Sequence, residues 1–243
     1  MSARGKRYDE ARSKIDREQV VSPAAAIRTL KEFPAAKFDE TVEAHFRLGL
    51  NVRHADQQLR GTIMLPHGTG KSVRVVVFAE GDKAREAEEA GADVIGSADL
   101  AKRVEEGFTD FDVAIATPDQ MGNVGKLGRV LGPRGLMPNP KTGTVTFDIG
   151  KAVTDAKGGK LEYRTDRGAC VHVSIGKKSF GGRDLLENYA ALVEEIVRAK
   201  PSASKGRYIH GVTITSTMGP GVKVDPTRVR GIVDELEQEA VPA

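Results

Sequence analysis

The side chains most often used in catalysis are few in this chain and lie far apart along it. The five histidines stand at positions 45, 54, 67, 172 and 210, without the short spacing of a metal-binding pair. Cys170 is the only cysteine, and no charge beside it would activate a thiolate, so we interpret it as a small strand residue. We expect His45 and His172 to lie on the wet faces of strands. The residue types therefore predict no catalytic site, no metal and no cofactor.

The segment LPHGTGKS at residues 65–72 is similar to a phosphate-binding loop but does not meet its requirements. Such a loop needs an earlier glycine, where this chain has Leu65, and it follows a strand and opens a helix, whereas this segment precedes a strand. A dinucleotide fingerprint is also missing, because AEGDKAREA follows the first buried strand with one glycine and with acidic Glu80 and Asp82. A nucleotide-dependent enzyme of the doubly wound class is therefore the disfavoured alternative, and residues 65–72 are interpreted as a connection between domains.

The distribution of charge suits a polyanionic partner, although the formal net charge is only +3. Two stretches, 121–147 and 196–224, contain lysine and arginine but no acidic residue. Phosphate contacts would use such stretches because each contact releases condensed counterions, but a solvated loop has the same composition. The basic residues of the first stretch are candidates for a secondary RNA contact: Lys126, Arg129, Arg134 and Lys141. The opening segment adds further bases, mixed with acids: Arg4, Lys6, Arg7, Arg12, Lys14 and Arg17.

Two short segments combine residue types that suit contact with RNA. In AKFDET (36–41), Phe38 stands between Lys37 and Asp39, an unusual setting for a core aromatic, although a strand-entry residue packed on its own helix would also fit. In TSTMGPG (215–221), hydroxyls, a flexible methionine and glycine-exposed backbone are adjacent. Such a surface suits an RNA backbone with its 2′-hydroxyls, where shape and polar contacts matter more than charge. An ordinary turn with Met218 as a gap-filler is the alternative.

Alternation of apolar and polar residues predicts the strands that position these segments. It runs through residues 41–50 and through YIHGVTITST (208–217), and LEYRTDRGACVHVSIG (161–176) reads as a hairpin-like pair of strands. The segment TMGPGVKVD (217–225) is interpreted as a turn rich in glycine and proline. Two helices are predicted in the same part of the chain: one capped by Ser22 with Pro23 in its first turn and ending by Pro34, and one over 182–200 ended by Pro201.

The middle of the chain has a different sequence pattern, in which apolar strands alternate with helices. The predicted elements are a strand at Val73–Ala79, a helix in 82–92, a short strand in 92–96, a helix in 97–107, a strand in 111–118 and a helix from Asp119 to about Leu131. Such alternation predicts a parallel, doubly wound sheet. We therefore predict an α/β protein with a discontinuous α+β domain of largely antiparallel sheet, 1–67 plus 159–243, and an inserted Rossmann-like domain, 68–158. Two connections that cross between the domains, near Pro66–Gly70 and near Gly150–Gly159, would permit hinge motion.

The cellular setting is predicted from what the composition lacks. No apolar run approaches the roughly 18 residues that cross a bilayer, so no membrane partner is expected. The charged start, MSARGKRYDEARSK, is unlike a signal peptide. A single cysteine suits a reducing compartment. The cytoplasm is the expected location.

Several stretches together carry a resemblance to a known family. They are AKFDETVEAHFRLGLN, DQQLRGTIMLPHGTGK, EEAGADVIG, FDVAIATPDQMGNVGKLGRVLGPRGLMPNPKTGTV and TSTMGPGVKVD. In this order they resemble the universal L-one family of large-subunit ribosomal proteins, over roughly residues 8–229. The glutamate-rich tail after Val229 lies outside the resemblance.

The resemblance implies that the discontinuous domain carries most of the ribosomal RNA contact. Lys37, Phe38 and Thr41 would belong to the first contact strand, and Thr217, Met218 and Gly219 to the RNA-binding triplet. Asp166 and Arg167 would lie in a turn that frames the same surface. Relatives read Asp-Lys-Thr-Gly there, whereas this chain continues with Gly168 and Ala169, which puts a hydroxyl contact at position 168 in doubt.

The resemblance also implies the partners. These are the ribosome, the stalk of the large-subunit rRNA, tRNA at the exit site and the protein's own operon mRNA, whose translation it would repress. The free protein would be a monomer. A general RNA or tRNA chaperone outside the ribosome is a second alternative to this function.

Overall fold

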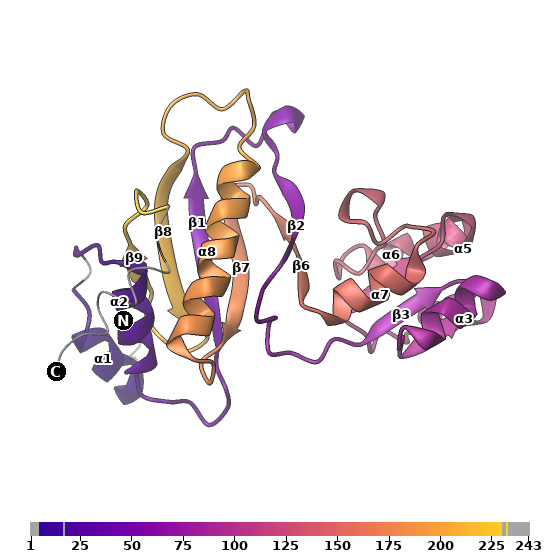
Figure 1. Ribbon diagram of the computed structural model, residues 1–243, viewed down its shortest axis with the longest axis horizontal. Coiled ribbons are helices and arrows are strands. Elements are labelled where there is room, and N and C mark those ends of the chain that lie inside the picture. The colour runs from indigo at the N-terminus through magenta and orange to yellow at the C-terminus, as the bar shows by residue number, and fades with distance from the viewer. Residues whose placement is uncertain (1–4, 17, 230–231, 233–243) are drawn as a thin grey trace. The chain divides into compact units, whose positions relative to one another are not determined.

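The computed structural model describes residues 5–16, 18–229 and 232, and the chain separates into two compact units (Figure 1). Unit 1 combines the residues up to Gly70 with those from Tyr163 onward, and unit 2 is Lys71–Glu162. Arg4, Arg17 and nearly all of the glutamate-rich tail lie outside the described residues. The two-unit α/β architecture agrees with the predicted fold class.

Unit 1 is built on an antiparallel sheet of four strands in the order β7-β1-β8-β9. The bounds are β1 Thr41–Leu48, β7 Cys170–Lys177, β8 Ile209–Ser216 and β9 Val222–Val224. The central strand β1 pairs with β7 on one side and β8 on the other, so segments far apart in the sequence lie side by side. The predicted strand at 41–50 is confirmed. The strand β9 falls where the sequence predicted only a turn, because three residues are too few to show alternation.

Two helices, α2 (Pro23–Lys31) and α8 (Gly182–Arg198), pack on one face of this sheet. Both were predicted, and the Ser22 hydroxyl caps α2 by accepting a hydrogen bond from the backbone N–H of Ala25 at 3.2 Å. Alternate residues of β1 point toward the helices and are buried, among them Phe46, whose ring stacks on that of Tyr189 in α8 with centroids 6.1 Å apart. The opposite face of the sheet keeps the polar residues of the alternation.

The predicted hairpin over 161–176 is wrong. The segments form β6 (Lys160–Arg164) and β7, but β6 pairs with β2 (Arg60–Met64) in a separate two-stranded sheet. Alternation of apolar and polar residues indicates that the two faces of a strand have different surroundings. It does not indicate which other strand lies beside it. Short elements complete unit 1: α1 (Lys6–Ser13) and a 3-10 turn, η1 (Ala55–Gln57).

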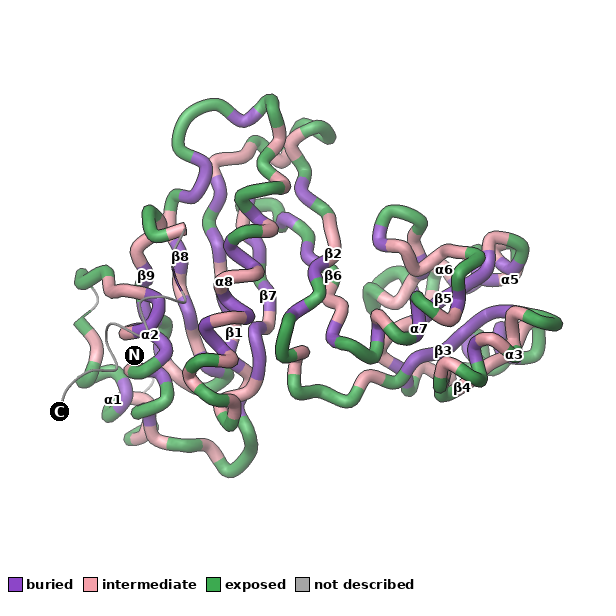
Figure 2. Tube along the Cα trace, viewed as in Figure 1, coloured by how far each residue is buried: buried purple, intermediate pink, exposed green. Residues whose placement is uncertain are grey.

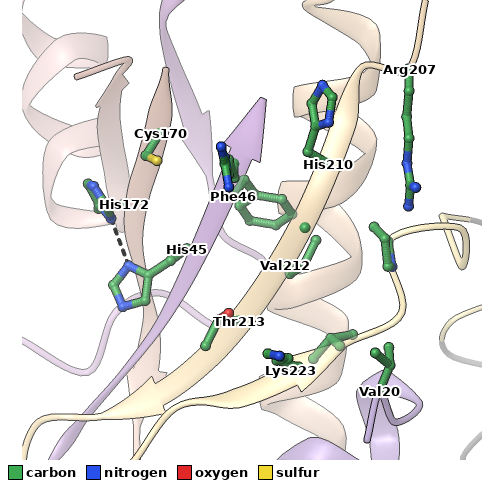
Figure 3. Close-up of a pocket in the computed structure, with 14 residues that line it drawn as sticks. Val20, His45, Phe46, Cys170, His172, Arg207, His210, Val212, Thr213 and Lys223 are labelled. Atoms are coloured by element: carbon green, nitrogen blue, oxygen red, sulfur yellow. Dashed lines mark hydrogen bonds between the residues drawn. The ribbon is translucent and has the colours of Figure 1, made fainter. Parts of the chain in front are cut away.

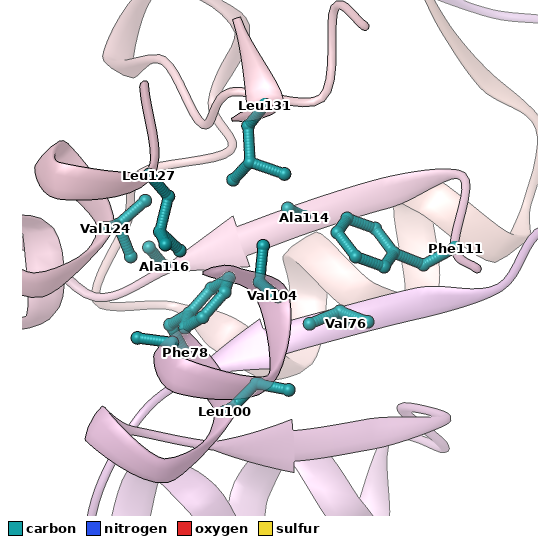
Figure 4. Packing of buried hydrophobic residues seen from close by; sticks show 11 residues of the cluster. Val76, Phe78, Leu100, Val104, Phe111, Ala114, Ala116, Val124, Leu127 and Leu131 are labelled. Atoms are coloured by element: carbon teal, nitrogen blue, oxygen red, sulfur yellow. The ribbon is translucent and has the colours of Figure 1, made fainter. Parts of the chain in front are cut away.

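Unit 2 has the predicted parallel sheet, with β3 (Val75–Phe78) between β4 (Val94–Gly96) and β5 (Val113–Ala116). Odd and even residues of β3 enter separate apolar clusters, which is why the whole strand is buried in Figure 2. Val75 and Val77 pack with α3 (Asp82–Glu89) and α7 (Ile149–Lys157). On the other face, Val76 and Phe78 pack with α4 (Ala98–Glu105) and with the leucines drawn in Figure 4.

The predicted helix from Asp119 to about Leu131 is broken into short turns. These are η2 (Pro118–Gln120), α5 (Met121–Val124), η3 (Gly125–Leu127) and α6 (Gly128–Leu131), followed by a further turn, η4 (Pro140–Thr142). Glycines at positions 122, 125 and 128 weaken a continuous helix, while Val124, Leu127 and Leu131 are buried and still face the core. Helix α7, capped by Asp148, occupies the stretch that the sequence suggested was a connection between domains.

None of the helices in the described part of the chain combines the length and hydropathy needed to cross a bilayer.

Candidate nucleic-acid interface

A buried carboxylate joins the two segments that the sequence singled out. Glu40 is 2% exposed and lies just before β1. Its carboxylate accepts hydrogen bonds from the backbone N–H of Ala36 at 3.0 Å, the hydroxyl of Ser216 at 2.7 Å and the backbone N–H of Met218 at 3.1 Å. One side chain therefore fixes the loop that carries Phe38 to the turn that carries Met218. We call the surface formed by residues 37–41 and 216–219 the Glu40 edge.

The electrostatics of Glu40 favour its charged form. Burial acts to raise the pKa of this carboxyl, but the hydrogen bonds from Ser216, Met218 and Ala36 act in the opposite direction. The positive charge of Lys178 adds to their effect, and the pKa of Glu40 is held below its ordinary value. The Glu40 edge is thus built on an ionised group that is satisfied by the protein itself.

Two threonines form hydrogen bonds that join the two segments of the Glu40 edge. The backbone N–H of Thr217 donates to the carbonyl of Thr41 at 3.0 Å, and the hydroxyl of Thr217 accepts from the backbone N–H of Thr41 at 3.0 Å. The hydroxyl of Thr41 in turn accepts from the ammonium group of Lys177 at 2.9 Å. The family resemblance implied Thr41 and Thr217 as RNA contacts, and both hydroxyls also form hydrogen bonds within the protein. Lys177 was missed, because only the β1–β7 register places it opposite Thr41.

The apolar side chains of the edge point to solvent. Phe38 is 54% exposed and Met218 is 49% exposed, and the neighbouring Lys37 is also exposed. Phe38 is therefore not packed as a core residue. Gly219 is required by a close approach, since a Cβ there would lie 2.5 Å from the Ser216 hydroxyl oxygen that bonds Glu40. An exposed apolar and cationic surface with backbone close beneath it suits stacking and ribose contacts.

Asp166 and Arg167 lie at the other end of the sheet from the Glu40 edge. The register pairs Thr41 with Lys177 but Arg47 with Cys170, so about 20 Å of strand separates the two ends. The Asp166 carboxylate accepts from the backbone N–H groups of Gly168 and Cys170, at 2.8 and 2.7 Å. Asp166 therefore shapes this turn, and Arg167 is exposed on it.

The turn at Gly168 and Ala169 has a local conformational cost. Ala169 has φ of +59°, the left-handed region that glycine adopts without strain. The chain places glycine one position earlier, at Gly168, so alanine bears a cost of about 1–2 kcal/mol. The two hydrogen bonds to Asp166 help to hold the turn despite this strain.

Between the two ends, the helix-free face of the sheet carries a hollow of about 510 Å³, which we call the sheet hollow. Figure 3 shows two of its lining residues, His45 of β1 and His172 of β7, joined by a hydrogen bond. Their Nδ1 atoms are 2.9 Å apart, and which ring donates depends on the tautomer. The sequence placed both histidines on wet strand faces, which the structure confirms; their proximity follows only from the register.

The surroundings of His45 disfavour its protonated form. Burial lowers the pKa of His45, and the adjacent His172 lowers it further. Glu43, whose carboxylate is 3.7 Å from His45 Nε2, opposes the effect without reversing it. Other titratable or charged groups that line the sheet hollow are Arg47, Cys170, Arg207, His210 and Lys223. Burial, together with Asp166, raises the pKa of the Cys170 thiol, so this cysteine is not an activated nucleophile.

The histidine pair predicts that stability falls on mild acidification. Because the pKa of His45 is lower in the folded chain than the unfolded value of about 6.5, the unfolded state binds this proton first as the pH falls. The free energy of unfolding should therefore decrease as the pH drops from 7 through the unfolded pKa, and level off below the folded pKa. Urea denaturation at several pH values measures this change. His45→Asn should flatten the dependence, whereas His54→Asn, at an exposed position, should leave it intact. An unchanged slope in His45→Asn would contradict the assignment.

The four basic residues proposed as a secondary contact all belong to unit 2. Lys126, Arg129, Arg134 and Lys141 are exposed on the turns that follow β5. Arg134 also donates a hydrogen bond to the hydroxyl of Thr109. The secondary RNA contact through these four residues stays a prediction.

The carboxyl ends of the parallel strands in unit 2, where doubly wound proteins bind nucleotides, are occupied by polar contacts within the unit. The Ser97 hydroxyl bonds the Glu80 carboxylate and lies 3.0 Å from the side-chain oxygen of Gln120. Across residues 5–16, 18–229 and 232, no group of three or more histidine, cysteine, aspartate or glutamate side chains could hold a metal ion.

The fold and the site define a two-unit α/β protein whose candidate surface is exposed at one end of the strands β1 and β8. The sequence model of the ribosomal protein L1p/L10e family matches residues 30–220, and the chain belongs to this family. It is therefore a structural ribosomal protein and not an enzyme.

Two relatives align over nearly their whole length. The large ribosomal subunit protein uL1 of Rubrobacter xylanophilus is 62% identical over 224 residues, covering 92% of this chain and 97% of the relative. The protein of the same name from Thermobifida fusca is 58% identical over 227 residues, covering 93% and 97%.

Proposed function

We propose that this protein, as a component of the large ribosomal subunit, binds the stalk of the large-subunit rRNA through the Glu40 edge. The observation that carries the proposal is the exposure of Phe38 and Met218 on a backbone frame fixed by buried Glu40. Bases and riboses can pack on such side chains, while Lys37 provides charge for the phosphates. The relatives' names support the assignment to the large subunit.

Two further roles belong to the same proposal. Stalk binding near the tRNA exit site would let the protein assist movement or release of exit-site tRNA. A similarly folded leader in its own operon mRNA would occupy the Glu40 edge in place of rRNA, and so repress translation when free protein accumulates. We also infer that the free protein acts as a monomer in the cytoplasm.

The test is filter binding of the purified protein to a stalk rRNA fragment and to an unrelated duplex of equal length, at two salt concentrations. Met218→Asp should weaken stalk binding about tenfold or more, since it removes an apolar contact and sets a carboxylate against phosphate. Met64→Asp is the matched control, because Met64 is equally exposed, at 50%, on β2 of the same unit. It should retain nearly wild-type affinity. Circular dichroism verifies that both variants are folded.

Two results would count against this function. Equal binding of the stalk fragment and the unrelated duplex would favour a general RNA chaperone. Equal loss of affinity in Met218→Asp and Met64→Asp would remove the Glu40 edge as the binding site.

A further inference from the structure

The Glu40 edge is continued by a second hollow, at the start of helix α1. This α1 hollow has a volume of about 750 Å³ and is lined by Gly5, Lys6, Arg7, Tyr8 and Met218. Met218 thus contributes both to the Glu40 edge and to the α1 hollow. A ligand that contacts Met218 can extend along the first turn of α1 without leaving the surface.

Helix α1 is attached to the same connection that carries Lys37 and Phe38. The Arg7 guanidinium donates to the carbonyl of Ala35 at 3.3 Å, and the Lys14 ammonium donates to the carbonyl of Glu32 at 3.0 Å. Ala11, between them on the helix, is buried. These contacts hold both ends of α1 beside the connection that carries Lys37 and Phe38.

The chemistry of the α1 hollow is cationic and apolar. Among its described lining residues, Lys6 and Arg7 are cations, Tyr8 and Met218 provide a ring and a thioether, and none carries a carboxylate. The acids of α1, Asp9 and Glu10, are not among the residues that line it. A ligand with regularly spaced negative charges and flat or ring-shaped groups between them matches this set, and a ribose–phosphate strand has that composition.

We propose that the first turn of α1 is part of the RNA-binding surface, and that the α1 hollow receives the strand that continues from Met218. This inference rests on the proposed function and adds a second contact region to it. Lys6 contacts a phosphate, and Tyr8 with Met218 packs against a ribose or base. Arg7 is a positioning residue, because its guanidinium bonds Ala35 and holds the helix in place.

The test compares two equal charge changes on one helix. Lys6→Gln should weaken binding to the stalk fragment about three- to tenfold at low salt, and should lower the slope of log affinity against log salt by about one. Arg12→Gln removes the same charge from an exposed position of α1 outside the hollow, and should leave both quantities unchanged. The exposure of Lys6 and Arg12 means that neither change removes a buried contact.

A crosslinking measurement provides an independent readout. Gly5 has open space where a Cβ would stand, so Gly5→Cys in a Cys170→Ser background can carry a photoactivatable aryl azide. Irradiation should crosslink this variant to the stalk fragment, whereas the same label at Arg12→Cys should react far less.

The outcomes separate this inference from the function on which it rests. Stalk-specific binding that is weakened by Met218→Asp but equally affected by Lys6→Gln and Arg12→Gln would overturn the α1 contact alone. That result would favour a protein partner, or the chain's own first residues, as the occupant of the hollow. Wild-type protein that does not prefer the stalk fragment would overturn both.

Discussion

Glu40→Ala is expected to lower the free energy of unfolding by about 3–5 kcal/mol and to reduce stalk-RNA affinity by a hundredfold or more. Three donors converge on this one carboxylate, and in the variant the backbone N–H groups of Ala36 and Met218 lose their acceptor. Burial of a polar group without a partner is costly. The loop and the turn of the Glu40 edge would also lose the group that holds them together. Urea denaturation and filter binding measure the two effects.

Two comparisons make this prediction specific. Glu43→Ala removes a carboxylate from β1 that is 43% exposed, and should change stability and affinity little. Glu40→Gln, which keeps one acceptor oxygen, should fall between Glu40→Ala and wild type. If Glu40→Ala loses stability but retains full RNA affinity, the Glu40 edge does not bind the RNA.

The pH dependence has a definite sign. The pKa of Glu40 is lower in the folded chain than in the unfolded chain, so its contribution is present above the unfolded pKa of about 4.3. The contribution is lost as the pH falls through the folded pKa. Glu40→Gln should remove this part of the acid sensitivity.

The importance of Glu40 was not predictable from the sequence. In AKFDET it is one acid beside another, Asp39, and residue type does not reveal that Glu40 is buried while Asp39 is exposed. The signals that pointed to the candidate site were the unusual setting of Phe38 and the combination of hydroxyls, methionine and glycine near Met218. Those signals pointed to the side chains at the surface. The role of Glu40, which is buried beneath them, became visible only in the three-dimensional structure.

Asn188→Leu is expected to lower the free energy of unfolding by about 3 kcal/mol. The Asn188 side chain is fully buried in α8 and accepts from the backbone N–H of His67 at 3.0 Å. It also donates to the carbonyls of Gly68 and Ile175, at 3.0 and 2.8 Å. Leucine has a similar volume but satisfies none of the three backbone groups, and each unsatisfied buried group costs about 1–3 kcal/mol.

The measurement has a local and a global part. Urea denaturation gives the stability, and hydrogen exchange at the His67 amide should be accelerated beyond the global loss. Asn123→Leu is the control, because Asn123 is half-buried in unit 2 and its side chain donates a hydrogen bond to the side-chain oxygen of Gln120. It should cost less than about 1 kcal/mol. Similar losses in the two variants would mean that Asn188 does not anchor the segment after β2.

The sequence predicted those elements that have a local signal of their own. It mispredicted those whose structure depends on strand pairing or on packing against distant residues. The cap at Ser22 and the apolar run of β3 are local signals, and both elements are confirmed. The strands β6 and β7 were assigned to one hairpin because they are adjacent in sequence, yet they enter different sheets. The helix expected from Asp119 is broken into short turns because the segment contains several glycines. The helical spacing of its apolar residues had suggested a continuous helix.

The strand order of unit 1 has a consequence for how the protein forms during its own synthesis. Thr41 and Thr217, which bond each other in the Glu40 edge, are 176 positions apart. All of unit 2 lies between them, so its parallel sheet can form while β1 still lacks both neighbouring strands. Under the proposed function, nascent chains would not bind the RNA, because the Glu40 edge exists only after translation has passed β8.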